Sequence, residues 1–344
     1  MNNPPPVESV SVIFIHEQQI FAVQRQSYLL AFPGYHAFPG GKIDADESSA
    51  AFETEFFREH DAIRMRALQR EIVEELAYDL EEGIKKGEVL SVSELAEALA
   101  PPFAPVRFRT WFYRVDLRKR IDFKVDSGEF ADSFWKTPDE LLETYRTGKS
   151  LMVPPTRWVL EGLQNNPQAT AFGDLSQDFA ENKTVPSLEM LEGIPALAVR
   201  SATLPPASRT NVFLLGDSDA PKLLIDPSPN SEEEYQRLLN TIEDKELDAI
   251  FLTHHHPDHH QFSNQLARQL KLPIILSQDT QQRLTLKNGK DYFEQIELRN
   301  VVENEEVTCW HGSAVRVYEI PGHDAGHLGL APDTLSWFIV GDLI

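Results

Sequence analysis

The sequence predicts a two-domain protein of the α+β and α/β classes, with a polar segment between its halves. Three observations support this. The length of 344 residues is about twice that of an ordinary domain. Strand-like and helix-like patterns occur on both sides of the polar segment. Hydrophobic residues make up 41% of the chain, enough for a core in each half. We therefore expect domains at residues 1–165 and 193–344, joined by a linker at residues 166–192.

In the first half, we expect strands where apolar, β-branched and aromatic residues run together or alternate, at residues 9–16, 20–24 and 106–117. We expect helices where apolar residues recur at helical spacing, at residues 48–80, 138–146 and 156–163. Clusters of Gly and Pro at residues 33–34 and 39–41 mark loops.

The second half alternates short apolar strands with helical patterns, which is typical of a layered α/β domain. The expected strands are at residues 211–215, 222–225, 248–252, 273–276, 314–320 and 335–341. The expected helices are at residues 231–244 and 259–270.

Charge and composition exclude several classes of function. The formal net charge is −22, from 32 basic and 54 acidic residues, which disfavours nucleic acid as a partner held by bulk attraction to phosphates. The single cysteine, Cys309, excludes an intramolecular disulfide and a zinc finger built on cysteines, and it indicates a reducing compartment. The sequence has no run of 18 apolar residues and no signal-like start, so we expect a cytoplasmic protein without a membrane span.

The first group of chemically suggestive residues is the string REIVEELAY at residues 70–78. On a helix, Glu71, Glu74 and Glu75 share one face, where their like charges repel one another. A hard divalent cation relieves that repulsion, and carboxylate oxygens suit Mg²⁺ or Mn²⁺. The glycine-containing loop at residues 38–41 can bring a backbone carbonyl to the same cation, and Arg70 can orient one of the glutamates. The ordinary alternative is a solvated acidic helix face.

The longer pattern around these glutamates resembles the box of the Nudix hydrolases, G-x5-E-x7-R-E-U-x-E-E-x-G-U, in which U is aliphatic. The matching residues are Gly41, Glu47, Arg70, Glu71, Ile72, Glu74 and Glu75. Two features depart from the pattern. Twenty-two residues, rather than seven, separate Glu47 from Arg70, and Ala77 and Tyr78 replace the final glycine and aliphatic residue. An insertion at this point resembles the branch that cleaves coenzyme A and its acyl esters.

This resemblance implies a mixed-sheet α/β/α sandwich that hydrolyses a pyrophosphate bond with Mg²⁺ or Mn²⁺. The implied substrate is a small molecule linked through a nucleoside diphosphate, with coenzyme A or an acyl-CoA as the best match. Glu74 and Glu75 would be the main metal ligands, and Glu71 would be a ligand or base, so that Glu71 and Glu74 are the candidate catalytic residues. Glu129 is a weaker candidate for an assisting acid, since an exposed loop glutamate is the simpler explanation.

The second group lies in the string DAIFLTHHHPDHH at residues 248–260, which places five of the eleven histidines within seven residues. A lone histidine is usually a satisfied surface or core residue, but imidazoles at this density beside a carboxylate suit Zn²⁺, or else iron or manganese. The spacing H-x-H-x-D-H comprises His254, His256, Asp258 and His259. Further along the chain, PGHDAGH contains His323, and FIVGD ends in Asp342.

This order of residues resembles the metallo-β-lactamase superfamily, whose fold is an αββα sandwich. The resemblance implies that His254, His256 and His323 bind a first metal, that Asp258 and His259 contribute to a second, and that Asp342 bridges both. Asp258 is therefore also a candidate catalytic residue. Asp226, in LLIDPS, resembles another recurring strand-end acid of the superfamily. His255, His260 and His327 have no role assigned by the resemblance. The superfamily places a last histidine ligand well beyond the Gly-Asp motif, so we expect a sandwich that is incomplete at the C-terminus.

Three functional hypotheses follow. In the first, both domains are hydrolases, and the second acts on a thioester, an RNA phosphodiester or a lactam. In the second, the Nudix-like part is a non-catalytic binding module, and the protein is an endoribonuclease or thioesterase of the metallo-β-lactamase fold. In the third, the second domain is a degenerate scaffold for partner binding. Metal content and coenzyme A cleavage discriminate between them.

Overall fold

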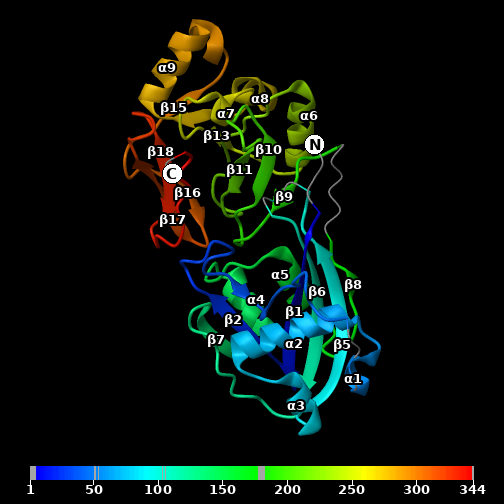
Figure 1. Cartoon of the computed structure of the whole chain (residues 1–344). Coiled ribbons are helices and arrows are strands. Elements are labelled where there is room, and N and C mark those ends of the chain that lie inside the picture. Colours follow the sequence, from blue (N-terminus) through cyan, green and yellow to red (C-terminus); the bar gives the residue numbers. More distant parts are fainter. Residues whose placement is uncertain are drawn as a thin grey trace. The chain divides into compact units, whose positions relative to one another are not determined.

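The computed structural model describes residues 5–49, 52, 54–102, 104, 106–176 and 183–342. The chain divides into two compact units, Met1–Asp178 and Phe179–Ile344 (Figure 1). The predicted linker at residues 166–192 includes residues 177–182, which lie outside the described residues. Strand pairing extends into both ends of this segment. Strand β8 (Gly173–Asp174) pairs with β5 (Val89–Leu99) in the first unit, and β9 (Ser187–Leu188) pairs with β10 (Ala196–Arg200) in the second.

A mixed sheet forms the centre of the first unit. Its other strands are β1 (Val7–His16), β2 (Gln19–Arg25), β3 (His36–Ala37), β4 (Gly40–Lys42), β6 (Phe108–Leu117) and β7 (Phe130–Lys136). Within the described residues the order is β3-β2-β1-β6-β5-β8, with β4 beside β1 and β7 beside β2. β1 runs parallel to β6, whereas β2 and β4 pair with β1 antiparallel. β1 thereby brings the Gly-containing strand β4 to the middle of the sheet.

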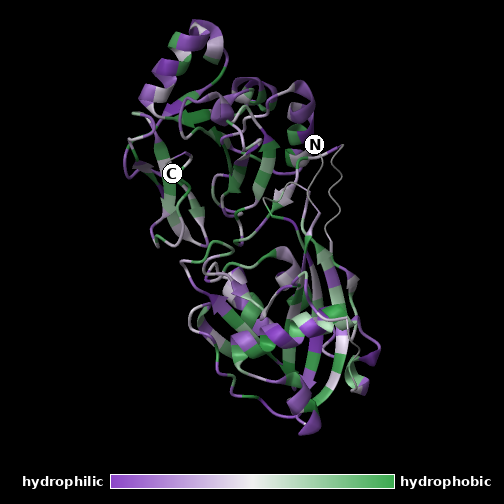
Figure 2. Ribbon diagram, in the orientation of Figure 1, coloured by the Kyte–Doolittle hydropathy of each residue, from purple (hydrophilic) through white to green (hydrophobic). Residues whose placement is uncertain are grey.

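Helices cover both faces of this sheet. Apolar side chains of α2 (Ala62–Leu76) pack on one face, and those of α4 (Pro138–Arg146) and α5 (Pro154–Asn165) pack on the other (Figure 1). Figure 2 shows that hydrophobic residues concentrate along the strands between these helices. This arrangement confirms the expected α/β/α sandwich.

The expected helix at residues 48–80 is wrong in its extent. The structure has three shorter helices, α1 (Glu55–Arg58), α2 and α3 (Leu80–Lys85). Asp61 caps the start of α2 by accepting a hydrogen bond from the Arg64 amide, and Asp79 caps α3 in the same way. Ala77 ends α2 in the left-handed conformation, with φ of 49°. Local capping therefore divides a segment whose apolar spacing is continuous.

The second unit contains two sheets. The larger is formed by β9, β10, β11 (Arg209–Leu215), β12 (Leu223–Ile225), β13 (Ala249–Phe251), β14 (Ile274–Leu276) and β15 (Leu298–Asn300). Within the described residues these strands lie in reverse chain order, from β15 to β9, and β12 to β15 are parallel. The smaller, antiparallel sheet consists of β16 (Glu306–Trp310), β17 (Ser313–Glu319) and β18 (Leu328–Pro332).

Two apolar layers hold the second unit together. One lies between the larger sheet and the helices α6 (Glu232–Ile242), α8 (Ser263–Leu270) and α9 (Gln278–Asn288). The other lies between the two sheets, where side chains such as Ile225 and Phe251 meet Val317 and Leu330. Helix on sheet on sheet is the order of layers expected for this half of the chain.

Two expected elements of the second half differ from the structure. The helix expected at residues 259–270 is broken at Phe262, whose φ is 64°, into α7 (Pro257–His260) and α8. The strand expected at residues 335–341 is absent from the described structure, where Leu335 takes a positive φ and a single bridge pairs Ile339 with Leu330. Among the described residues, no helix combines the length and apolar character needed to cross a membrane.

Candidate metal centres

In the first unit, the loop around β4 meets the acidic face of α2. The amide of Gly40 donates a hydrogen bond of 2.8 Å to Oε2 of Glu75. A Cβ at Gly41 would meet the Glu71 carboxylate at under 3 Å, so glycine lets the loop approach this side chain without displacing it. Burial of α2 against the sheet leaves Glu75 only 3% exposed. The backbone of the glycine loop and two of the predicted glutamates therefore form one site.

Arg70 joins the two halves of the interrupted motif. Its Nε donates a hydrogen bond of 2.8 Å to Oε1 of Glu47, and its Nη2 donates one of 2.8 Å to the Lys42 carbonyl. Its Nη1 donates to Glu71 at 2.8 Å and lies 3.4 Å from Glu74. The insertion between Glu47 and Arg70 is thus accommodated without separating the motif residues.

The three glutamates of α2 differ in environment. Burial raises the pKa of Glu75 to about 9, and the charge of Glu129 adds to this effect. Burial also raises the pKa of Glu71, against the lowering effect of Arg70. The side chain of Glu74 is 60% exposed. Glu129 is held by Arg25, whose Nη1 lies 3.1 Å from its Oε1.

The glutamates do not converge as tightly as the histidines do. Among the described residues, every group of three or more ligand side chains with atoms within 4.8 Å of one another lies in the second unit. The members of these groups are His254, His255, His256, Asp258, His259, His323, Asp324 and Asp342. The structure thus brings together all six metal ligands predicted for this unit.

Adjacent parallel strands position the histidine cluster. The carboxyl ends of β12 and β13 lie at the same sheet edge, where Asp226 directly follows β12 and Thr253 stands two residues after the end of β13. Asp226 accepts hydrogen bonds from the Thr253 amide at 2.8 Å and from the Thr253 hydroxyl at 2.6 Å. It also contacts Nδ1 of His259 at 2.8 Å. Asp226 therefore fixes the loop that leads to the cluster and orients the ring of His259.

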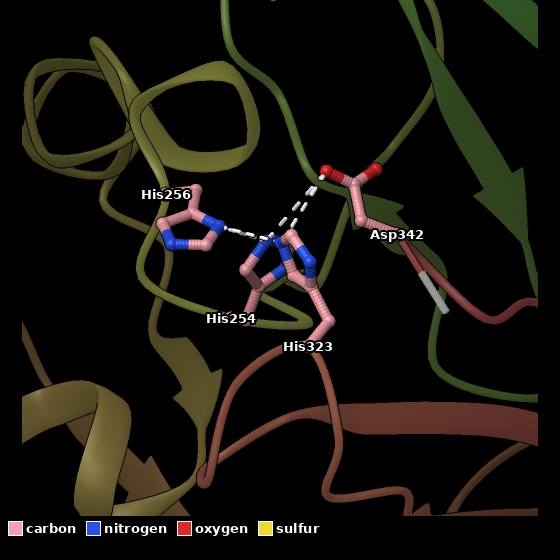
Figure 3. A group of neighbouring side chains, drawn as sticks. All are labelled: His254, His256, His323 and Asp342. Carbon is pink, nitrogen blue, oxygen red and sulfur yellow. Dashed lines mark hydrogen bonds and ion pairs between the residues drawn. The ribbon is translucent and has the colours of Figure 1, made fainter. Parts of the chain in front are cut away.

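The ring nitrogens of three histidines converge in Figure 3. His256 Nδ1 lies 3.0 Å from His254 Nε2 and 2.8 Å from His323 Nε2. Oδ2 of Asp342 lies 4.0 Å from His254 Nε2 and 3.8 Å from His323 Nε2. His254 and His256 come from the loop after β13, and His323 comes from the loop after β17. Residues far apart in the sequence therefore point at one small volume.

Asp258, His259 and Asp342 form a second group beside the first. His259 Nε2 lies 3.0 Å from Oδ1 of Asp342 and 3.9 Å from Oδ2 of Asp258. Asp342 belongs to both groups, as expected for a bridging residue. Burial alone would lower the pKa of His259, but Asp226 and Asp342 outweigh it and raise the value to about 10. The hydrogen bond with His259 lowers the pKa of Asp342 to about 2.

The donor set fits a transition metal. Burial, with neighbouring histidines, lowers the pKa of His254 to about 2, and burial also lowers that of His256. Both rings are therefore neutral near pH 7, which is the form that binds metal. With Zn–N bonds of about 2.0 Å, nitrogens of a tetrahedral site lie roughly 3.3 Å apart, close to the observed separations. The set contains imidazole and carboxylate but no thiolate, a combination that suits zinc and also iron or manganese.

Sequence reasoning left some residues of this site without a role. His255 forms an ion pair with Asp324, and both lie directly beside metal-ligand candidates in the sequence. His327 is buried, with its ring centre 4.5 Å from that of His254. The Nδ1 of His260 contacts the Tyr292 hydroxyl at 2.8 Å, so this ring nitrogen has a hydrogen-bond partner outside the cluster. Adjacency to predicted ligands was the only signal in the sequence for these contacts.

Curated proteins and solved structures are each similar to a part of the chain. A hydroxyacylglutathione hydrolase of Wigglesworthia glossinidia brevipalpis is 30% identical over 135 residues, which cover 39% of this chain and 46% of that protein. One from Bdellovibrio bacteriovorus is 28% identical over 138 residues, covering 39% and 48%. The chain thus spans about half the length of these relatives. The crystal structure of a NUDIX hydrolase from Alicyclobacillus acidocaldarius has a TM-score of 0.39 and 18% identity, covering 47% of this chain and 93% of that one.

Two family models match the chain without overlapping. The NUDIX domain model matches residues 5–158, which include the glycine loop and α2. The metallo-beta-lactamase superfamily model matches residues 205–344, which include the histidine cluster. The first range thus contains the glutamates of α2, and the second contains the converging histidines. The chain therefore joins a Nudix domain to a metallo-β-lactamase superfamily domain, and both families are hydrolases.

Proposed function

We propose that the chain is a metal-dependent hydrolase with two active sites, one in each domain. The observation that carries this proposal is the presence of two separate ligand sets. Carboxylates lie beside a glycine loop in the first unit, and imidazoles converge with Asp342 in the second. Both sets belong to domains of hydrolase families. The single cysteine, Cys309, supports a reducing location, and we propose the cytoplasm.

For the Nudix site, the proposed reaction is hydrolysis of a pyrophosphate bond in a nucleoside-diphosphate-linked compound, with coenzyme A or an acyl-CoA as the substrate. Glu71, Glu74 and Glu75 would hold Mg²⁺ or Mn²⁺, which when bound neutralises charge on phosphate oxygens and activates water. Arg70 holds Glu71 in place through its 2.8 Å hydrogen bond. The Gly40 amide fixes one oxygen of Glu75, so its other oxygen is free to face the metal.

The test for this site is cleavage of coenzyme A. Purified protein with Mg²⁺ or Mn²⁺ is expected to release an adenosine bisphosphate, measured by chromatography. Glu74→Gln is expected to abolish release while circular dichroism stays unchanged, because Glu74 is an exposed side chain whose loss leaves no cavity. Glu143→Gln, at an exposed position of α4, is the matched control and should keep full activity. Activity that survives Glu74→Gln would refute the assignment.

For the metallo-β-lactamase site, we propose hydrolysis of a thioester. The names of the matched relatives denote a hydroxyacylglutathione substrate, and an acyl group carried on glutathione is a thioester. The net charge of −22 also disfavours RNA as the alternative substrate. His254, His256 and His323 would hold Zn²⁺, or else iron or manganese, and Asp342 would join them to a second ion at Asp258 and His259. Zinc when bound lowers the pKa of its water to near neutrality.

Within this site, the chain's own groups have distinct roles. Burial keeps His254 neutral and ready to bind metal. Asp226 holds the His259 ring, and Asp258 lies within reach of the same ring nitrogen that faces Asp342. We propose that Asp258 orients a water molecule and accepts its proton.

Release of free thiol from hydroxyacylglutathione and from an acyl-CoA tests this second activity, because thiol reagents report it directly. The double substitution His254→Ala with His256→Ala is expected to abolish release. His311→Ala, in the exposed turn after β16, should leave it unchanged. Cleavage of RNA with no thiol release would instead support an endoribonuclease.

A non-catalytic Nudix module is the second candidate function. The departures from the motif favour it, namely the 22 residues between Glu47 and Arg70 and the Ala77 that stands in place of glycine. Coenzyme A or another nucleotide would then bind without being cleaved. Calorimetry that shows nucleotide binding, together with chromatography that shows no product, would support this candidate.

A further inference from the structure

Two residues without an assigned role lie in the two loops that carry the histidine ligands. His255 stands between His254 and His256 in the loop after β13, and Asp324 directly follows His323 in the loop after β17. Nδ1 of His255 forms an ion pair with Oδ2 of Asp324. We propose that His255 and Asp324 are a positioning pair that ties the two ligand loops together. This inference rests on the proposed metal site.

Asp324 is itself firmly anchored. It is only 6% exposed, and its Oδ1 accepts a hydrogen bond of 2.8 Å from the Gly326 amide. The Gly326 carbonyl in turn accepts one of 2.8 Å from the Ser277 hydroxyl, at the N-cap of α9. A Cβ on Gly326 would come within 2.7 Å of Cβ of Asp279, so the turn packs directly on the first turn of this helix. Asp324 therefore offers His255 a rigid point of attachment.

The His255–Asp324 pair lies next to the proposed ligands His256 and His323. The ring centres of His255 and His256 are 4.7 Å apart, and Nδ1 of His256 is 2.8 Å from Nε2 of His323. A change in the pair therefore reaches the point at which the two loops meet. Groups around a metal site that orient its ligands typically change metal affinity by about 10- to 100-fold when they are removed.

Burial makes the contact with His255 important to Asp324. A buried carboxylate is costly unless it has polar partners, and among the described lysines and arginines the one that pairs with Asp324 is Arg283, with Nε 4.0 Å from Oδ1. Arg283 also forms an ion pair with Asp279 at the start of α9. His255 therefore gives Asp324 a side-chain partner that comes from the other ligand loop.

The test measures binding of Co²⁺ to the full-length chain by competition with a chelator and by visible absorption, which reports ligand geometry. Asp324→Ala is expected to weaken Co²⁺ binding by about 10- to 100-fold and to alter the absorption bands. His255→Ala is expected to give a similar loss, and it removes a less buried side chain if Asp324→Ala does not fold. The double variant should be no weaker than the weaker single variant, because both remove one contact.

Glu234→Gln is the matched control. Glu234 is a buried carboxylate of α6 that pairs with Arg237, away from the cluster. This variant is expected to lower the melting temperature without changing the Co²⁺ affinity or spectrum. Unchanged affinity in folded Asp324→Ala, or additive losses in the double variant, would overturn the pair. A third outcome would also overturn it: Asp324→Ala binds one Co²⁺ ion fewer at saturation, while the affinity for the remaining ions is unchanged. His255, His256 and Asp324 would then form a separate metal site. A wild-type chain that binds no Co²⁺ would instead refute the proposed metal site.

Discussion

The carboxylate site of the first unit and the histidine site of the second respond in opposite ways to the same physical effect. Burial favours the neutral form of any ionisable group. It raises the pKa of Glu75 to about 9, so this carboxyl holds a proton near pH 7 when no metal is bound. It lowers the pKa of His254 to about 2, so this imidazole is already in the form that binds metal.

The difference teaches that burial prepares His254 for metal but opposes metal at Glu75, whereas the carboxylates beside His259 raise the pKa of that ring to about 10. The histidine site resembles a preformed cage, with nitrogens 2.8 and 3.0 Å apart. The carboxylate site must lose a proton before Glu75 can bind a cation, and Arg70 holds two of its glutamates in the meantime. We expect tight metal binding at the histidine site and pH-dependent, exchangeable binding at the carboxylate site.

The largest expected effect is loss of the resident transition metal from the His254→Ala, His256→Ala double variant, because it removes two of three converging imidazoles. Elemental analysis of the purified protein measures this. Mn²⁺ binding at the Nudix site should persist, since its carboxylates are untouched. A wild-type protein that is metal-free after mild purification would contradict the comparison between a preformed and an exchangeable site.

The next effect is on Mn²⁺ binding at the Nudix site, measured in a variant that combines His254→Ala, His256→Ala and Asp342→Ala, because these changes remove ligands from both ion sites proposed for the second unit. Affinity is expected to rise about tenfold per pH unit towards pH 9, because one proton leaves Glu75 for each ion bound. Glu75→Gln should weaken binding at least about tenfold and remove this slope. A slope that survives the substitution would show that another group titrates.

The raised pKa of Glu75 also determines how the stability of the first unit changes with pH. The pKa of Glu75 rises on folding from 4.5 to about 9, so the folded state binds more protons than the unfolded state in this interval. The free energy of unfolding of the metal-free protein should therefore fall as the pH rises from about 4.5 towards about 9. Denaturant titrations at several pH values, with Glu75→Gln as the control, measure this contribution.

A smaller effect is expected from Gly41→Ala, which places a methyl group against the Glu71 carboxylate. Arg70 restrains that carboxylate, so it cannot simply move away, and Mn²⁺ affinity should fall by about tenfold. In a Glu71→Ala background the substitution should have little further effect, because the collision is gone. An equal loss in both backgrounds would place the cause in the backbone instead.

Local patterns in the sequence predicted much of this molecule. The alternation of strands and helices predicted the layered second half, and the resemblance to the Nudix hydrolases implied the sandwich of the first. The histidine cluster could be found because motif spacing is a local feature, and the resemblance to the metallo-β-lactamase superfamily implied its ligand roles. Helix breaks were harder to predict. Asp61, Ala77 and Phe262 interrupt segments whose apolar spacing is continuous, and the sequence pattern does not report the backbone angles that they adopt.

Contacts between distant segments were beyond the reach of such patterns. The ion pair of His255 with Asp324 and the support of His259 by Asp226 depend on which strand ends lie together. The raised pKa of Glu75 depends on how deeply the sheet buries it, since the neighbouring Glu74 in the same motif remains exposed. Motif spacing identifies such side chains, but tertiary packing determines their protonation.

The smallest expected effect tests the departure of Ala77 from the Nudix pattern. Ala77 ends α2 with φ of 49°, a left-handed conformation that costs an alanine about 1 kcal/mol and suits glycine. Ala77→Gly is therefore expected to raise the free energy of unfolding of the first unit by about 1 kcal/mol, measured by denaturant titration. Lys86→Gly is the matched control, because Lys86 ends α3 with φ of −79° and gains nothing from glycine.

Because Ala77 lies next to the acidic face of α2, a gain in stability with unchanged Mn²⁺ affinity would show that the altered motif costs stability and leaves metal binding intact. A loss of stability would show that this helix end does not adopt the left-handed conformation.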